Sequence, residues 1–148
     1  VERVLGKKAV GVRVHYLRVR IEDLSLLSEA GFVYDSSLCF VKDRVSPDNM
    51  GFMRISGLLE FPITLMDAYM FTYMKLREED VLRVIDEALR AALRYAKQVV
   101  TILWHDVSLK MKGGRKYKDV VEHLASLDWV RVVNGTELVR LVEEGVVR

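Results

Sequence analysis

Side chains that can carry acid–base or anion-binding chemistry stand just after several predicted β-strands. The first predicted strand is followed by arginine, histidine and tyrosine, the second by aspartate and serine, the third by threonine and aspartate, and the fourth by histidine and aspartate. In chain order these residues are Arg13, His15, Tyr16, Arg18, Asp35, Ser36, Ser37, Thr64, Asp67, His105 and Asp106. The carboxyl ends of parallel strands meet at one edge of a sheet, so the set predicts a polar rim at which catalytic groups could gather. Any α/β protein has a polar rim, so a rim without function fits the same pattern.

His105 fits a catalytic role best. It follows the apolar segment Ile102-Leu103-Trp104 and precedes Asp106. An imidazole can take up or release a proton near neutral pH, as a general acid must. The competing interpretation is a histidine that caps or hydrogen-bonds the end of a strand.

The other two histidines are less informative. His15 stands between Arg13 and Tyr16, and it either lines a site or packs at the edge of the sheet. His123 lies in the middle of a predicted helix among charged neighbours, which predicts a solvated surface residue.

The sequence shows no metal-ligand pattern. The three histidines lack a partner at the three- or four-residue spacing of a helix-borne metal site, so no metal ligand is assigned. Gly113 and Gly114 lie among lysines and lack the context of a phosphate-binding loop. Cys39 has no base that can be assigned to it, so we do not expect it to act as a nucleophile.

The elements that must position these residues alternate along the chain. Apolar and β-branched runs predict strands at 9–14, 32–34, 58–61, 99–104 and 130–133. Apolar stripes at helical spacing predict helices at 22–30, 66–74, 78–98, 117–127 and 136–144. Residues 35–56 are expected to form a long irregular loop, and such loops are usually functional. This order predicts an α/β fold in which the strands of a parallel sheet alternate with helices.

The composition is that of one globular domain. The chain has 148 residues, 51% hydrophobic and 30% charged, which excludes a disordered tail and is short for two domains. The net charge of +2 provides no strong field, so neither nucleic acid nor a membrane is expected as a partner. The single cysteine, Cys39, cannot form an internal disulfide, which makes a cytoplasmic location the default expectation. Few Asn, Gln and Pro residues hint at a thermophile.

Four segments, in order, resemble the later half of a polysaccharide deacetylase (NodB-homology) domain. They read GVRVHYLR at 11–18, EAGFVYDSSL at 29–38, LEFPITLMD at 59–67 and LWHD at 103–106. The resemblance covers nearly the whole chain, so residues 1–148 are expected to form a single polysaccharide-deacetylase-like domain that lacks its N-terminal half. It implies that the strands and helices are part of a distorted (β/α) barrel of about seven strands.

The resemblance also implies an activity and three catalytic residues. The activity is the metal-dependent hydrolysis of N-acetyl groups on a carbohydrate polymer. Arg13 matches the arginine that orients a catalytic aspartate in this family. Tyr16 matches the residue whose backbone N–H binds the oxyanion, and His105 matches the general acid.

Four further residues are expected to contact the substrate or support these groups. Leu103 matches the leucine of the family's acetyl pocket, and Asp67 loosely matches an acidic residue near the catalytic histidine. The predicted substrate-binding residues are His15, Asp67, Leu103 and Trp104.

One departure from the family sets the expectations for cofactor and partners. The family's metal site, an aspartate pair followed by two histidines, precedes the arginine motif and is not found here. We therefore expect no cofactor in this chain alone, zinc only together with the missing N-terminal half, and no activity of the isolated chain. The expected partners are a carbohydrate substrate and either a second copy, as a homo-oligomer, or a complementing N-terminal half, because half a barrel exposes unpaired strands.

Two alternatives stand beside this interpretation. The first is a non-catalytic, deacetylase-like half domain that acts in carbohydrate binding or protein association. The second is an α/β domain whose likeness to the family is coincidental.

Overall fold

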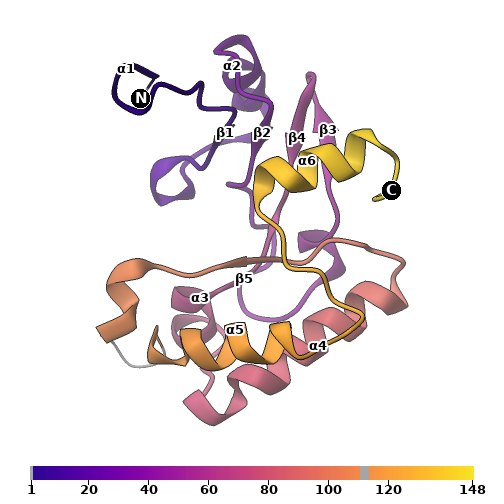
Figure 1. Ribbon diagram of the computed structural model, residues 1–148. Helices are drawn as coiled ribbons and strands as arrows, with labels where there is room; N and C mark the ends of the chain where they lie inside the picture. Colours follow the sequence, from indigo (N-terminus) through magenta and orange to yellow (C-terminus); the bar gives the residue numbers. More distant parts are fainter. Residues whose placement is uncertain (1, 111–113) are drawn as a thin grey trace. The chain divides into compact units, whose positions relative to one another are not determined.

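The computed structural model describes residues 2–110 and 114–148, and the chain divides into two compact units (Figure 1). Unit 1 consists of Val1–Leu38, Phe52–Pro62 and Val133–Arg148, and unit 2 consists of Cys39–Gly51 and Ile63–Val132. Helices and parallel strands occur in both units, so the mixed α/β class is confirmed. The strands form two hydrogen-bonded sheets, of four and two strands, so the expectation of one parallel sheet is wrong.

Unit 1 contains a sheet of four short strands in the order β1-β2-β4-β3. β1 pairs in parallel with β2, β2 pairs in parallel with β4, and β3 pairs with β4 in the antiparallel direction. The predicted strands at 9–14, 32–34 and 58–61 are present, but they are shorter, and the second is shifted toward the carboxyl end. The four strands are β1 (Gly11–Val12), β2 (Tyr34–Asp35), β3 (Met53–Ile55) and β4 (Leu58–Glu60).

The β3–β4 hairpin corrects the expectation that residues 35–56 form only a loop. Its two connecting residues, Ser56 and Gly57, have φ angles of 50° and 82°. A two-residue connection with positive φ at both positions matches the twist of paired strands and favours glycine. β3 has only three residues, so its alternation of side chains is too short to stand out in the sequence.

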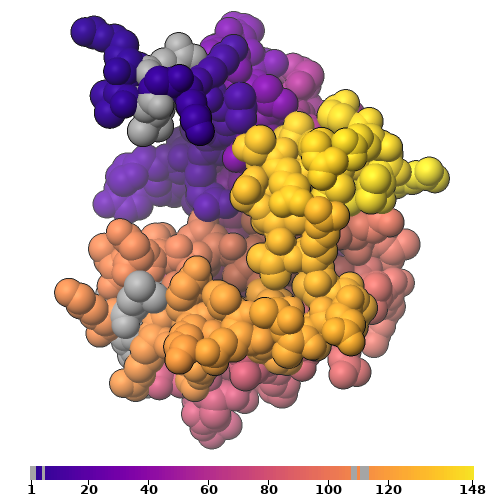
Figure 2. Space-filling model, viewed as in Figure 1, coloured from indigo at the N-terminus to yellow at the C-terminus, as the bar shows by residue number. Residues whose placement is uncertain are grey.

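Helices cover both faces of the unit 1 sheet (Figure 1). α2 (Leu24–Glu29) packs Leu24 into an apolar cluster with Leu58. α6 (Gly135–Glu143) meets the opposite face, because Arg54, which pairs with Leu59, donates from Nη1 to Glu143 at 3.0 Å. Figure 2 shows α6, in yellow, on the viewed surface. The helices predicted at 22–30 and 136–144 are thereby confirmed, and a short helix, α1 (Glu2–Leu5), precedes β1.

Unit 2 is built around one parallel strand pair and a helical core. β5 (Ile63–Met66) pairs with β6 (Thr101–Leu103). The helices are α3 (Asp67–Thr72), α4 (Val81–Arg94) and α5 (Tyr117–Ala125), which confirms the helices predicted at 66–74, 78–98 and 117–127. α4 supplies the largest share of the core, namely Val81, Val84, Ile85, Ala88, Leu89 and Ala92. Of the helices in the described part of the chain, none is long and apolar enough to cross a bilayer.

Short 3-10 turns complete the chain. They are η1 (His15–Leu17), η2 (Ile21–Asp23), η3 (Pro47–Asn49), η4 (Glu78–Asp80), η5 (Asp106–Lys110) and η6 (Gly114–Lys116). The glycine pair considered in the sequence falls partly on Gly113, which lies outside the described residues.

One further strand prediction needs correction, and one strand was not predicted. The sequence predicted no strand at β5, because Pro62 directly precedes it and the helix predicted at 66–74 overlaps its last residue, Met66. Residues 130–133 form no strand, although they are rich in valine. Val132 is 67% exposed, and without a neighbouring strand its β-branched side chain gains no cross-strand packing.

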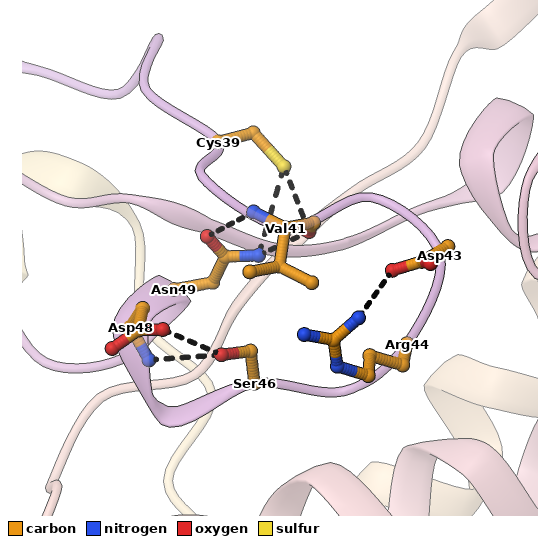
Figure 3. Close-up of polar contacts among 7 residues, drawn as sticks. All are labelled: Cys39, Val41, Asp43, Arg44, Ser46, Asp48 and Asn49. Carbon is orange, nitrogen blue, oxygen red and sulfur yellow. Dashed lines mark hydrogen bonds and ion pairs between the residues drawn. The ribbon is translucent and has the colours of Figure 1, made fainter.

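The segment 39–51 in unit 2 is an ordered loop that one buried asparagine closes (Figure 3). Asn49 Oδ1 accepts hydrogen bonds from the N–H groups of Phe40 (2.8 Å) and Val41 (3.3 Å), and Nδ2 donates to the Val41 carbonyl at 2.5 Å. The Thr64 hydroxyl in β5 donates to the Asn49 carbonyl at 2.5 Å, which ties the loop to the sheet. Asn49 and Ser46 therefore satisfy backbone groups of this segment with their side chains.

Gly11 should be intolerant of a side chain, because the Tyr34 ring occupies the space. A Cβ at Gly11 would lie 1.9 Å from Tyr34 Cζ, and one at Gly135 would lie 2.5 Å from Tyr34 Cε2, so the ring is packed against two glycines. We expect Gly11→Ala to lower the free energy of unfolding by about 1–3 kcal/mol, the usual cost of overpacking. Urea denaturation measures the change.

The double variant Gly11→Ala/Tyr34→Ala is the control. It should be less destabilised than the sum of the two single variants, because removal of the ring relieves the clash. Strict additivity would contradict the proposed packing.

Candidate functional site

The structure brings Asp67 and His105 together in unit 2. Asp67 is the first residue of α3, directly after β5, and His105 follows β6 by two residues. Since Met66 and Leu103 are register partners in this parallel pair, the residues that follow them meet at the same end of the strands. Asp67 Oδ1 lies 2.6 Å from His105 Nδ1.

The Asp67 carboxylate holds the histidine at a second point. Its Oδ2 accepts the backbone N–H of His105 at 2.9 Å, and its Oδ1 also accepts the N–H of Ala68 at 2.6 Å. Asp67 is 2% exposed, whereas the His105 side chain is 45% exposed. A buried acceptor therefore fixes both the backbone and the ring of a histidine that solvent or a ligand can reach.

This arrangement suits a proton donor. A carboxylate at Nδ1 selects the ring tautomer and stabilises the protonated imidazolium. The proton that a substrate exchanges then moves at Nε2. The neighbouring Asp106 is exposed and accepts the N–H of Val107 at 2.8 Å, so it caps the following turn and does not contribute to this contact.

The other predicted residues near His105 are fixed by their own contacts. Leu103 is buried at the end of β6. Trp104 is half-buried, its Nε1–H donates to the Gly114 carbonyl at 3.0 Å, and its ring lies 6.0 Å from that of Tyr117 between centroids. The indole is therefore locked to the 114–117 segment.

Arg13, His15 and Tyr16 belong to unit 1. Arg13 Nε donates to the Ser36 carbonyl at 2.7 Å, and its Nη2 donates to the Ser36 hydroxyl at 2.9 Å. Burial lowers the pKa of the Arg13 guanidinium from its ordinary value, and the carboxyl groups of Asp35 and Glu60 oppose that shift. The guanidinium remains charged, as arginine does in proteins.

The turn at 15–17 carries backbone strain. Tyr16 and Leu17 both have φ angles of 56°, in the left-handed region that residues other than glycine seldom adopt. Tyr16 is 76% exposed, its ring lies 4.1 Å from that of His15 between centroids with the planes tilted by 55°, and the Arg18 guanidinium lies 5.4 Å from its centroid. Strained residues of this kind often occur at functional sites.

Sequence reasoning missed a buried acid pair in unit 1. Asp35 and Glu60 are register partners on neighbouring parallel strands, and both are fully buried. Burial, reinforced by Asp35, raises the pKa of Glu60 to about 8. The sequence does contain a signal for this pair. Glu60 is a charged residue inside the otherwise apolar predicted strand 58–61, and Asp35 directly follows the predicted strand 32–34.

Two other expectations change with the structure. His123 is not a solvated histidine, since its side chain is half-buried and its Nε2 lies 2.7 Å from Asp86 Oδ1 across α5 and α4. The thiol of Cys39 donates to the Val41 carbonyl at 3.4 Å, and burial raises its pKa, as in a structural cysteine. Within residues 2–110 and 114–148, no group of three His, Cys, Asp or Glu side chains fits a zinc site.

A groove of about 490 Å³ lies along α4 in unit 2. Val45 and Pro47 form one part of its lining, and Tyr95, at the end of α4, is half-exposed beside it. Its ionic residues include paired ones, because Arg83 contacts Asp80 and Glu87, and Asp86 contacts His123. Arg90 and Arg94 add two further guanidinium groups on the same helix.

No family model matches this chain, and a search of curated proteins finds no match either. The assignment of function therefore depends on the geometry described above and on the motif resemblance.

His105 should carry its proton on Nδ1 when the ring is neutral, because the Asp67 carboxylate can only accept a hydrogen bond. Long-range ¹H–¹⁵N correlation spectra above neutral pH distinguish the two tautomers. Asp67→Asn should abolish the preference, whereas the matched variant Asp106→Asn should leave it unchanged. A predominant Nε2–H form in the unmodified protein would contradict the assigned hydrogen bond.

Proposed function

We propose that this chain forms part of a polysaccharide deacetylase, which hydrolyses N-acetyl groups on a carbohydrate polymer when the metal-binding half is supplied. The contact between Asp67 and His105 carries the proposal. The motif resemblance assigned the general acid to His105 and matched Asp67 only loosely. An aspartate–histidine pair at that position is what the assigned proton transfer needs.

In the proposed reaction, His105 acts on the leaving group. When the C–N bond of the tetrahedral intermediate breaks, the amine nitrogen takes the proton from Nε2 of the imidazolium. Asp67 stabilises the charged ring before the transfer and holds its orientation. These side chains are proposed for the proton-donor part of the reaction, and the activation of water is assigned to the metal-binding half that the motif resemblance implies.

The unit 1 residues are proposed to serve the carbonyl side of the reaction. The strained turn at 15–17 would present the Tyr16 N–H to the developing oxyanion, as the motif resemblance implies. Arg13, held by Ser36, is a fixed positive charge that could orient a carboxylate from the missing half. His15, Leu103 and Trp104 remain the proposed contacts for the sugar and its acetyl group.

The proposed fold is part of a distorted (β/α) barrel completed by another segment or by a second copy. β1 stands at the end of the strand order in unit 1, so its outer side is an edge on which a further strand could pair. A cytoplasmic location stays the expectation that the single cysteine suggested.

A second candidate function is carbohydrate binding without catalysis, and the α4 groove favours it. Tyr95 could stack on a sugar ring, and Arg90 and Arg94 could donate hydrogen bonds to hydroxyl or carboxylate oxygens. In this case the ligand would contact α4, and His105 would have no part in binding.

Titration with a chitin pentasaccharide tests both candidates on the chain as it exists. If the chain belongs to a deacetylase, amide shifts should gather at residues 103–106 and at the Trp104 indole. His105→Ala should weaken binding there, and Asp106→Asn should not. Shifts confined to Arg90, Arg94 and Tyr95 would favour the second candidate, and no shift anywhere would contradict both.

The variants His105→Ala and Asp106→Asn should differ in deacetylase activity once the metal-binding half is supplied. His105→Ala should lower the rate of acetate release by about 10²–10⁴-fold, the usual loss for a general acid. Asp106→Asn should retain the rate. An unchanged rate for His105→Ala would remove the catalytic assignment.

Self-association through the β1 edge should be measurable by light scattering at micromolar concentration. Val10 and Val12 turn their carbonyls toward β2, so residue 9 directs its backbone groups to the open side. Ala9→Pro removes an N–H from that side and should lower the weight-average molecular mass, whereas Ala9→Ser should not. A monomer in all three proteins would contradict the proposed pairing of copies.

A further inference from the structure

The Asp35–Glu60 pair in unit 1 has a deficit of hydrogen-bond donors. Asp35 Oδ1 accepts the Ser37 hydroxyl at 2.7 Å, and Oδ2 accepts the Ser37 N–H at 3.1 Å. Glu60 Oε1 accepts the N–H groups of Leu38 (2.8 Å) and Ser37 (3.2 Å). Glu60 Oε2 is buried and has no donor among the described residues. A buried carboxylate oxygen without a donor is strongly unfavourable.

A proton on this oxygen resolves the deficit. As an O–H group, Glu60 Oε2 becomes a donor, and Asp35, its buried register partner on the neighbouring strand, offers a carboxylate as acceptor. Two buried carboxyl groups side by side also cannot both ionise without strong repulsion. The same proton therefore removes an unsatisfied atom and one of two like charges.

Among the described residues, Arg13 is a positive charge that acts on both carboxyl groups of the pair. The segment after β1 contributes Arg13, and β2 contributes Asp35 itself and the phenol of Tyr34. β3 places Met53 opposite Glu60, and α2 places Leu24 in the adjoining apolar cluster with Leu38 and Leu58. One negative charge on the pair is balanced by Arg13, whereas a second would lie in an apolar setting.

We propose that Asp35 and Glu60 share one proton at neutral pH, and that this singly charged pair positions the Arg13–Tyr16 segment. Only the catalytic role of the Arg13–Tyr16 segment rests on the proposed function. The shared proton is a property of the folded chain.

Two serines connect the pair to that segment. The Ser37 hydroxyl donates to Asp35 and accepts the N–H of Val14 at 2.8 Å. The Ser36 hydroxyl donates to the Phe61 carbonyl at 2.8 Å and accepts Arg13 Nη2. The acid pair fixes the turn at 35–38, and the turn fixes the two residues that lead into the strained 15–17 turn. Asp35 and Glu60 are therefore positioning residues, not catalytic ones.

The sign of the pH dependence follows from the proton count. In the unfolded chain, Glu60 ionises near its ordinary pKa of 4.5, whereas in the folded chain the pKa is about 8. Between these values the folded state binds the additional proton, so the stability falls as the pH rises from about 4.5 to about 8. Above that range, both states are ionised, and this contribution no longer changes.

Infrared spectroscopy and carboxyl ¹³C NMR of the full chain test the shared proton directly. The unmodified protein should show a protonated carboxylic acid at pH 7 that titrates near pH 8. Glu60→Gln should remove this signal, because the amide supplies the missing donor without a titrating group. The exposed Glu29→Gln is the matched control and should leave the signal in place. Two ionised carboxylates at pH 7 in the unmodified protein would overturn the proposal without any variant.

The positioning role has its own readout in the Arg13 Nε–H resonance. In the unmodified protein this resonance should shift with the same midpoint as Glu60, and in Glu60→Gln it should stay constant across that range. The melting temperature should fall between pH 5 and 8 in the unmodified protein and not in Glu60→Gln. If the Arg13 resonance does not shift as Glu60 titrates, the positioning role is overturned. If the oligosaccharide fails to bind at His105, only the proposed function is contradicted.

Discussion

Buried carboxyl groups need donors, and the two units meet this requirement in different ways. In unit 2, Asp67 receives two backbone N–H groups and a histidine ring. In unit 1, Asp35 and Glu60 share the donors of one short turn, and one oxygen is left over. The first solution permits a full negative charge that orients His105, while the second favours retention of a proton. Both place the carboxyl groups at the ends of parallel strands, where backbone N–H groups of the following turn become available.

The same requirement explains why the long segment after β2 is ordered. Asn49 lies in the interior, and its amide replaces the hydrogen bonds that a strand would have given to residues 40 and 41. Thr64 then joins that loop to β5 and accepts the N–H of Thr101 at 3.1 Å, where the register of the pair shifts. The Thr64 side chain thus supplies a hydrogen-bond acceptor for the Thr101 N–H at the point where the backbone pairing of β5 and β6 is irregular. Loops held in this way are rigid supports for neighbouring strands.

The sequence predicts the parts of this structure that depend on local pattern. The apolar stripe of α4 and the run Leu58–Glu60 have enough consecutive signal to mark a helix and a strand. Residues 130–133 have strand-like composition but no strand beside them, and composition cannot supply a partner. β5 escapes prediction because it directly follows Pro62 and overlaps the helix predicted at 66–74 at Met66. The motif resemblance matched Asp67 only loosely to an acidic residue near the histidine, and its contact with His105 depends on the register of β5 with β6. The Asp35–Glu60 pair likewise depends on the register between strands far apart in sequence, which no local pattern predicts.

The contacts of Arg13 and His105 have one feature in common. Arg13 is bound by Ser36 within unit 1, and His105 is bound by Asp67 within unit 2. Each group takes its orientation from a buried acceptor in its own unit. Catalytic groups that are fixed beforehand lose little conformational entropy when a substrate binds. Preorganisation in each unit therefore comes from contacts that the unit itself supplies, Ser36 for Arg13 and Asp67 for His105.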